Sequence, residues 1–531
     1  MKKITFSIFK LVFAFSLLAF MPTEGNSTHL MGSDFTYKCE GAGKFKLILK
    51  IYRDCRGVGL GGSANVRIEA PGCGTQTVSA PRIAINDVTP KCVTASGPCS
   101  PQNTYGSGKG IEEHTYEVIV DFTKAPYNTW AANGCCKVYF SWQSCCRNGA
   151  ITTGVGGGFY SYAMLDICNM KASKDTLCNN SPTLTNPPIA FACCNQPFTY
   201  NNGASDNKDY DSLSYEMVAA LGNSRTNTLP PSAPLTVKSP MTVYCGFGNT
   251  PPCTPIPQAK PPIGFFLDPE TGDMIFTPTD CSEVGVVAIQ VNEWRKDTSG
   301  VYKLVGITRR DIQVWVENCD KNNPPVLLGP YAYSVCEGDK LCFDIRSKDD
   351  PVVVPPPGVS QTPDTTQLSW NKGIPGATFK IKDPKVRERV GQFCWEPQIG
   401  QASSLPYTFT VTAKDQACPR PAVSIRGYSV TVKKRALGER VYDTFPCGKL
   451  VFECFPEDGF QGVPKYLWAL KDLTQTQIFY TSGSKKDSFR FRRGGTYIAE
   501  LVLNNSASCP TVYLDTIEIP KFIEVELAVG D

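Results

Sequence analysis

Alternating apolar and polar residues predict several half-buried strands in the N-terminal third of the chain. In the segment 45–54 (FKLILKIYRD), Phe45, Leu47 and Leu49 share one face, whereas Lys46 and Lys50 lie on the other. The segments TYEVIVDF (115–122) and KVYFSWQS (137–144) alternate in the same way. This period of two is typical of antiparallel strands that pack one face on a core. We therefore expect an all-β fold.

Proline clusters divide the 531 residues into units. SPTLTNPP (181–188) and NNPP (322–325) form two stiff boundaries, and a third follows YSVTVKKRA (428–436). The predicted units are 28–188, a cysteine-rich β domain; 189–320 and 324–434, two β-sandwiches; 435–520, a further sandwich; and 521–531, the start of another module or a tail.

The second and third units share a sequence pattern that suggests an internal repeat. Each has an acidic loop, a segment such as GFFLDPETGDMIFTPT (264–279), and a final alternating strand, RRDIQVWVENC (309–319) or RGYSVTVKK (426–434). Repeated strand patterns of this kind are typical of tandem sandwich modules.

The first 27 residues have the layout of a secretory signal peptide. Two lysines precede an apolar run, Pro22 ends it, and small residues favour cleavage after Ser27. An uncleaved membrane anchor is the less favoured alternative, because the clean apolar core 11–21 is too short to cross a bilayer. No later segment is long and apolar enough to be transmembrane. We expect an extracellular or outer-surface protein.

Charge and histidine content argue against two classes of function. The formal net charge is only +4, so we expect no nucleic-acid partner. With His29 and His114 as the only histidines, a Ser-His-Asp triad or a histidine-rich zinc site is disfavoured. Hydrolysis by paired carboxylates needs no histidine, so a secreted hydrolase with its site in 28–188 stays an alternative. We expect no enzymatic activity.

Adjacent cysteines are the most distinctive chemical feature, as in GCCKVYFSWQSCCRNGAI (134–151). An even total of 24 cysteines in an exported chain favours disulfides over a zinc or redox site. Neighbouring strand residues point to opposite faces, so each member of a pair is expected to find a different partner. Odd counts in the first and last groups require a bond between groups or an unpaired thiol. The disulfide candidates are Cys39, Cys55, Cys73, Cys135, Cys136, Cys145, Cys146, Cys193 and Cys194.

Two sets of loop aspartates are candidate calcium ligands. Hard cations prefer clustered carboxylate oxygens on loops. The sets are Asp206, Asp209 and Asp211 in one loop, and Asp349, Asp350 and Asp415 at the equivalent place in the next unit. Solvated turn residues are the favoured alternative, because aspartate commonly caps turns. Calcium is the one cofactor we consider.

Most of the seven tryptophans fall on predicted strands, which indicates core packing. Trp130 lies in the loop-like segment YNTWAANG (127–134), so we select it as the tryptophan to test for ligand contact.

Several segments resemble a known family. DPETG and YTFTVTAKD resemble cadherin-like or bacterial Ig-like modules, and FRFRRGGTYIAELVLNNSASC (489–509) resembles a PKD-type module. YRDC, SCCRNGAI and the opening THLMGSDFTYKCEGAGKFKL resemble large surface proteins of Bacteroidetes. Relatives of that kind often carry a gliding-motility-associated sorting domain for type IX secretion. No such domain is recognisable before residue 531.

The resemblance implies a disulfide-stiffened, adhesin-like scaffold on the cell surface that presents its N-terminal domain. It also implies association with the outer-membrane export machinery. The expected partner is a surface protein or a glycan, and a carbohydrate-binding protein is the alternative function.

Overall fold

The computed structural model describes residues 29–522 apart from 42, 102, 104–109, 169–177, 207, 210, 298, 320–321, 351–364, 419, 458–462 and 505–508. The predicted leader lies outside these residues. The described chain is built of strands with one short 3-10 helix, which confirms the predicted all-β class. No helix in the described part is both long enough and apolar enough to cross a membrane.

An N-terminal barrel is formed by a sheet that closes on itself. Its hydrogen-bonded order is β1-β2-β5-β4-β3-β6-β7-β18, and β18 also pairs with β1 through Asp311 and Ser33. Aromatic and aliphatic side chains of these strands fill the interior. The bounds are β1 Leu30–Gly41, β2 Lys44–Asp54, β3 Ser63–Ala70, β4 Gly74–Asp87, β5 Ile111–Asp121, η1 Tyr127–Thr129, β6 Lys137–Ser144, β7 Phe159–Asp166 and β18 Tyr302–Glu317.

The second module is a sandwich that shares β18 with the barrel. One layer is β9-β18-β17-β12 and the other is β10-β16-β15, with a common core between them. The predicted boundary at residue 188 therefore does not separate two sheets, because β18 hydrogen-bonds strands on both sides of it. The bounds are β8 Thr183–Leu184, β9 Ile189–Cys193, β10 Phe198–Tyr200, β11 Ala204–Ser205, β12 Ser212–Val218, β13 Ala220–Leu221, β14 Thr228–Leu229, β15 Phe266–Leu267, β16 Met274–Phe276 and β17 Val284–Lys296.

The third module packs two four-stranded sheets, β19-β21-β24-β23 and β20-β26-β25-β22, around one core. Its strand β20 runs parallel to its last strand β26, just as β9 runs parallel to β18 in the second module. This shared arrangement agrees with the internal repeat in the sequence. The bounds are β19 Val326–Leu328, β20 Ala332–Cys336, β21 Leu341–Lys348, β22 Gln367–Trp370, β23 Thr378–Ile381, β24 Val390–Trp395, β25 Tyr407–Lys414 and β26 Val423–Lys433.

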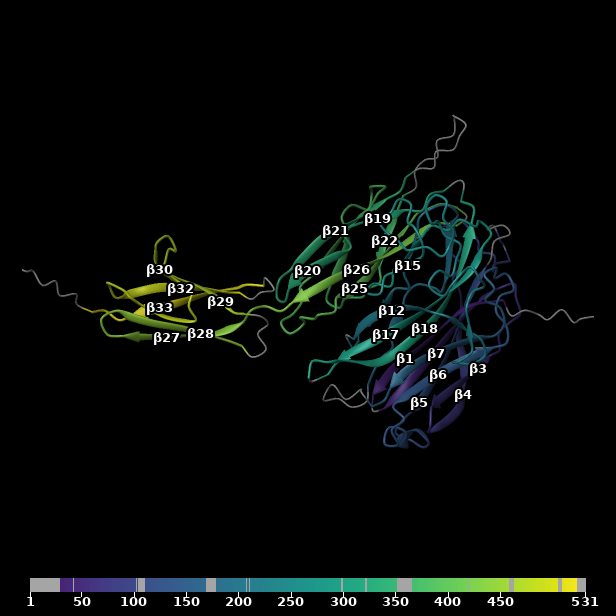
Figure 1. Ribbon diagram of the computed structural model, residues 1–531, viewed down its shortest axis with the longest axis horizontal. Coiled ribbons are helices and arrows are strands. Elements are labelled where there is room, and N and C mark those ends of the chain that lie inside the picture. The colour runs from purple at the N-terminus through teal and green to yellow at the C-terminus, as the bar shows by residue number, and fades with distance from the viewer. Residues whose placement is uncertain are drawn as a thin grey trace, which may run out of the picture.

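The fourth module projects from the others as a separate lobe, drawn in yellow in Figure 1. The sheets β27-β28-β31 and β30-β29-β32-β33 enclose a core around the buried Trp468. Its bounds are β27 Gly438–Phe445, β28 Lys449–Pro456, β29 Lys465–Lys471, β30 Ile478–Ser482, β31 Lys486–Arg490, β32 Gly495–Asn504 and β33 Thr511–Ile519. The division of the chain into independently folding units stays a prediction.

A buried ion pair fastens β18 to β1 where the barrel closes. Arg310 is 0 % exposed, and its Nε and Nη2 donate to the two carboxylate oxygens of Asp34 at 2.5 and 2.6 Å. Its Nη1 donates to Asn202 Oδ1 at 2.9 Å, so the guanidinium also contacts the second module. This bidentate geometry satisfies a charge that would be costly to bury alone.

We expect Asp34→Ala to lower the free energy of unfolding by about 3–5 kcal/mol, because it leaves the Arg310 guanidinium buried without its counter-charge. Urea unfolding followed by tryptophan fluorescence measures the change. The double variant Asp34→Leu/Arg310→Met is the control, and it should lose less because it buries no charge. A loss under about 1 kcal/mol for Asp34→Ala would contradict the role given to this pair.

Candidate functional site

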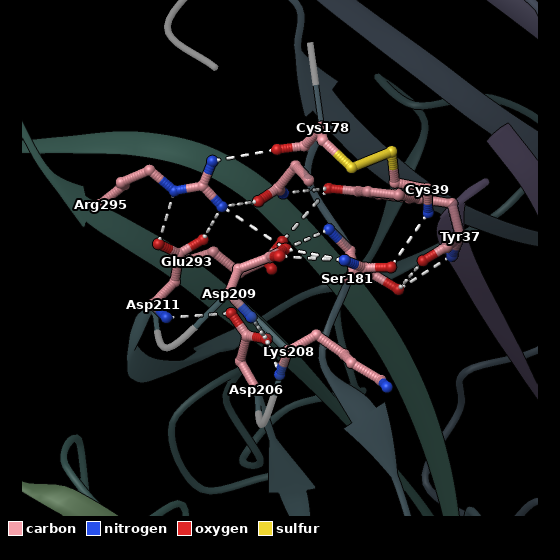
Figure 2. A network of polar contacts seen from close by, with 12 residues as sticks. Tyr37, Cys39, Cys178, Ser181, Asp206, Lys208, Asp209, Asp211, Glu293 and Arg295 are labelled. Atoms are coloured by element: carbon pink, nitrogen blue, oxygen red, sulfur yellow. Dashed lines mark hydrogen bonds and ion pairs between the residues drawn. A yellow bond between two sulfur atoms is a disulfide. The ribbon is translucent and has the colours of Figure 1, made fainter. Parts of the chain in front are cut away.

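A network of polar side chains joins four segments at one end of the second module (Figure 2). The segments are β1, residues 178–181, the loop 205–211 between β11 and β12, and β17. The disulfide between Cys39 and Cys178 fixes the second segment against β1. Two hydrogen bonds then join Ser181 to Tyr37. The Tyr37 backbone N–H donates to Ser181 Oγ at 2.9 Å, and the Ser181 backbone N–H donates to Tyr37 O at 3.0 Å.

The loop folds around the carboxylate of Asp206. This carboxylate accepts hydrogen bonds from the backbone N–H groups of Asp209 (3.2 Å) and Asp211 (3.0 Å). Arg295 holds the far end of the loop, since Nε and Nη2 donate to the two oxygens of Asp211 at 2.8 and 2.7 Å. Asp209 accepts from the Asn180 side-chain amide at 3.0 Å.

Glu293 is the most deeply buried carboxylate of this network. The alternation that points Val287, Ile289 and Val291 of β17 into the core continues to Glu293, which is 0 % exposed. Its Oε2 accepts from the Tyr37 hydroxyl at 3.3 Å, whereas its Oε1 has no hydrogen-bond partner.

Gly306 of β18, which lies directly opposite Glu293, leaves the space that this carboxylate occupies. A Cβ at that position would meet Glu293 Oε2 at 1.7 Å and the Tyr37 hydroxyl at 2.7 Å. Any larger residue at 306 would therefore displace the buried carboxylate.

The carboxylates oppose one another's ionisation. Burial, followed by the charges of Asp211 and Asp209, raises the pKa of Asp206 to about 7. Burial also raises the pKa of Asp211, although Arg295 acts in the opposite direction. For Glu293, burial and then the charges of Asp206 and Asp211 raise the pKa well above its ordinary value. The cluster therefore holds more carboxyl groups than Arg295 alone can balance in their ionised form, and burial favours their protonated form.

Oxygen ligands converge at this site. One carboxylate oxygen from each of Asp206, Asp211 and Glu293 lies within 4.8 Å of the others. Asp206 and Asp211 also line a cavity of about 50 Å³, and its opposite wall is formed by the third module, including Ser403 and Tyr407. A set of hard oxygen donors without nitrogen or sulfur is the type that Ca²⁺ prefers.

The predicted loop aspartates thus lie together, but Asp209 is engaged by Asn180 and the missed residue Glu293 completes the group. The sequence VGVVAIQVNEW (284–294) contains the signal for Glu293. Every second residue from Val287 to Val291 is apolar and points inward, and Glu293 occupies the next inward position. Alternation alone therefore marks Glu293 as a buried acid.

The second predicted set does not form an equivalent group among the described residues. Asp415 Oδ2 accepts from the Asn322 amide at 2.7 Å, and Asp350 is exposed and pairs with Lys348 at 2.9 Å. Asp349 is buried, and its backbone N–H donates to Glu388 Oε1 at 3.4 Å. The carboxylate oxygens of this second set do not converge on one point, as those of Asp206, Asp211 and Glu293 do.

All nine candidate cysteines are disulfide-bonded in the structure. Members of two adjacent pairs, 135/136 and 193/194, take different partners, as expected. The bonds among the described residues are 39–178, 55–99, 73–135, 92–418, 136–168, 145–146, 193–319, 194–281, 245–253, 336–509 and 342–394.

One pair differs from the expected arrangement, because Cys145 and Cys146 are bonded to each other. Both follow the end of β6, so the alternation that separates neighbouring side chains no longer applies there. The odd group counts arise because the bonds 92–418 and 336–509 cross between groups; Cys447 and Cys454, both in the last group, are free thiols.

The selection of Trp130 for ligand contact is wrong. Its side chain is 2 % exposed and packs edge-on against Phe122 and Tyr127. The segment around it forms the short helix η1, which turns the indole into the barrel core.

Comparisons with known proteins leave the family open. No protein family model matches the chain, and no curated protein matches it. Solved structures with some likeness include domains A168–A170 from titin, at 10 % identity and a TM-score of 0.22, covering 61 % of this chain and 98 % of that one. The four N-terminal Ig domains of Dscam1 isoform 6.44 reach 8 % identity and 0.21, covering 92 % and 99 %. Drosophila N-cadherin EC1-4 reaches 10 % and 0.20, covering 72 % and 82 %. At these scores the likenesses carry no argument about function.

We expect the acidic network to make metal-free stability depend on pH. The pKa of Asp206 is about 7 in the folded protein, whereas an aspartate in an unfolded chain has a pKa of about 3.9. Between these values the unfolded state releases the proton more readily than the folded state, so the free energy of unfolding falls as pH rises. With EDTA present, Asp206→Asn should therefore stabilise the protein on the order of 1–2 kcal/mol at pH 8, and by progressively less towards pH 4. Thermal unfolding across this range measures the effect. Asp280→Asn, in an exposed loop, is the control; an equal gain at both pH values in Asp206→Asn would contradict the prediction.

Proposed function

We propose that the protein is a non-enzymatic extracellular scaffold, adhesin-like in role, whose modules are locked together so that one end is held away from the other. Eleven disulfides among the described residues support an oxidising, extracellular location. The observation that carries the proposal is that one disulfide joins the third module to the barrel and another joins it to the fourth module.

The joint between the third module and the preceding units is both covalent and polar. Cys92 of the barrel bonds to Cys418 of the third module. Asp273, which is 3 % exposed, accepts from the backbone N–H of Gly427 at 2.7 Å. A Cβ at Gly427 would lie 2.7 Å from the Thr271 side chain and 3.1 Å from Asp273 Oδ1, so the second module packs directly against this backbone. Such contacts resist bending between the modules.

The joint between the third and fourth modules is built in the same manner. The disulfide Cys336–Cys509 crosses it. Arg435 lies in the connection and donates through Nε to Glu337 O (2.9 Å) and through Nη1 to Pro510 O (3.2 Å). The Glu337 carboxylate accepts from the Arg435 backbone N–H at 3.0 Å. One arginine thus clamps both modules beside the disulfide.

Calcium at the acidic network is part of the proposal. Asp206, Asp211 and Glu293 would hold the ion, and the bare Oε1 of Glu293 is the observation that favours it. An ion there would neutralise the excess negative charge and order the loop 205–211. Because this loop faces the third module across the small cavity, its order would also support the joint.

The finer origin of the protein also belongs to the proposal. The leader, the PKD-like sequence of the fourth module and the YRDC and SCCRNGAI segments favour a surface protein of Bacteroidetes. Gliding motility and type IX secretion are the processes in which relatives of that kind take part. The partner would then be a surface protein or a glycan.

We expect the double variant Cys336→Ser/Cys509→Ser to make the fourth module mobile, because it removes the covalent closure of the joint. A maleimide dye on Cys447, which is free and exposed, reports this motion by fluorescence anisotropy decay. In the unmodified chain the slow rotational correlation time reflects tumbling of the whole molecule. In the variant we expect a shorter correlation time, of the size expected for one module tumbling by itself. Cys245→Ser/Cys253→Ser, a bond within one loop, is the control. Unchanged decay in the first variant would contradict a locked scaffold.

We expect Ca²⁺ to raise the midpoint of thermal unfolding and EDTA to reverse the rise. At a calcium concentration of 100 times Kd the gain is about 2.7 kcal/mol. Glu293→Gln should abolish the response, because it removes the buried charge that faces the ion. Asp350→Asn removes an exposed acid outside the network and should keep the response. An identical midpoint with and without calcium would exclude the ion while leaving the scaffold intact.

A further inference from the structure

The N-terminal barrel opens where two neighbouring strands part. β3 and β6 are hydrogen-bonded only from Glu69↔Tyr139 to Arg67↔Ser141. Beyond that point β3 continues to Ser63 paired only with β4, and β6 continues to Ser144 paired only with β7. The sheet therefore splays, and a cavity of about 520 Å³ lies in the opening. This volume lies within the range of about 300–1,000 Å³ that small-ligand sites occupy.

The cavity persists because one inward position is small. The inward side chains of β3 are Ala64, Val66 and Ile68, and Ala64 supplies only a methyl group at the splayed end. On β6, Trp142 occupies the next inward position after Phe140, where it packs against Phe159 at 6.1 Å between ring centroids. Its indole is half-buried and forms one wall of the cavity.

The lining combines aromatic faces with polar groups, and its charged residue Arg67 is paired with Glu69 at 3.2 Å. Trp142, Tyr116 and Tyr160 provide the rings, while Asn65 and Gln143 lie at the rim with exposed side chains. Amide side chains donate and accept hydrogen bonds in one plane, so they suit ligands that carry neighbouring hydroxyl groups. The apolar C–H face of a sugar ring packs on an aromatic face in the same way as other flat apolar groups.

From this chemistry we propose that the opening between β3 and β6 is a carbohydrate-binding site for a neutral, hexose-containing glycan. The sugar ring lies against Trp142, and its hydroxyl groups hydrogen-bond to Asn65 and Gln143. None of the residues that line the cavity is acidic, so the site lacks the carboxylate pair that glycoside hydrolysis requires. The glycan is bound and not cleaved.

A peptide strand is the competing occupant, and the geometry of the opening disfavours it. An added strand needs an edge about 4.8 Å away along its length. Because β3 and β6 converge at Arg67 and Ser141, the opening is a wedge and cannot keep that distance to both edges. A compact ring fits a wedge better than an extended backbone does.

The test is a glycan array that displays glucose-, galactose-, mannose- and N-acetylglucosamine-terminated oligosaccharides, probed with the full chain. The strongest array ligand is then titrated against variants by calorimetry. We expect Trp142→Ala to weaken binding at least 10-fold and Asn65→Ala/Gln143→Ala to weaken it comparably. Ala64→Leu should block binding by filling the cavity without removing any contact. Gln76→Ala, at an exposed position of β4 outside the cavity, should bind as the unmodified chain does.

Several results would overturn the proposal. The proposal is wrong if the array gives no signal. It is also wrong if glycan binding survives both Trp142→Ala and Ala64→Leu. Capture of an extended peptide in competition with the array ligand assigns the opening to strand addition instead. Circular dichroism confirms that each variant is folded. Because the calcium and joint measurements do not involve β3 or β6, their failure and the failure of this site are separable.

Discussion

The buried pair of Arg310 and Asp34 sits on the strand that the architecture depends on. β18 pairs with β7, β1 and β9 in succession along one edge and with β17 along the other, so the same strand closes the barrel and builds the second module. A strand with two sets of neighbours must keep one register towards both, since a one-residue slip would exchange its two faces. A buried bidentate ion pair, with Asn202 as a third partner, enforces a single register more sharply than apolar contacts do.

Rigidity spreads from this shared strand by covalent means. The barrel and second module share one continuous sheet, so a hinge between them would break backbone hydrogen bonds. The third and fourth modules have separate sheets, and these are the places where disulfides cross between units, at Cys92–Cys418 and Cys336–Cys509. The hydrogen bonds of the shared sheet thus hold the first two modules together, and disulfides hold the third and fourth modules in place. Tandem sandwiches joined only by short linkers would otherwise be free to bend.

Local pattern predicted local structure well, and contacts between distant segments poorly. Alternation located the strands that became β2, β5 and β6, and it placed the aspartates of the loop 205–211 together. It could not show that β18 pairs across the boundary at residue 188, because non-local pairing leaves no mark within one segment. Trp130 was misjudged for the same reason, since a loop-like composition does not reveal that η1 turns the indole inward. Glu293 was detectable, but only by extending the inward series of β17 one position beyond its last apolar residue.

The acidic network and the cavity between β3 and β6 both lower the stability of the fold, and the rest of the structure must offset that loss. Asp206, Asp211 and Glu293 gather charge in a poorly solvated place, and the opening beside Ala64 leaves apolar wall without packing partners. A marginal fold would remove such features, since each lowers stability without aiding the core. Here they lie in a chain whose register is set by buried ion pairs and whose modules are cross-linked. Residues that break local rules within an otherwise consistent structure indicate ligand sites, and on that ground both are expected to be functional.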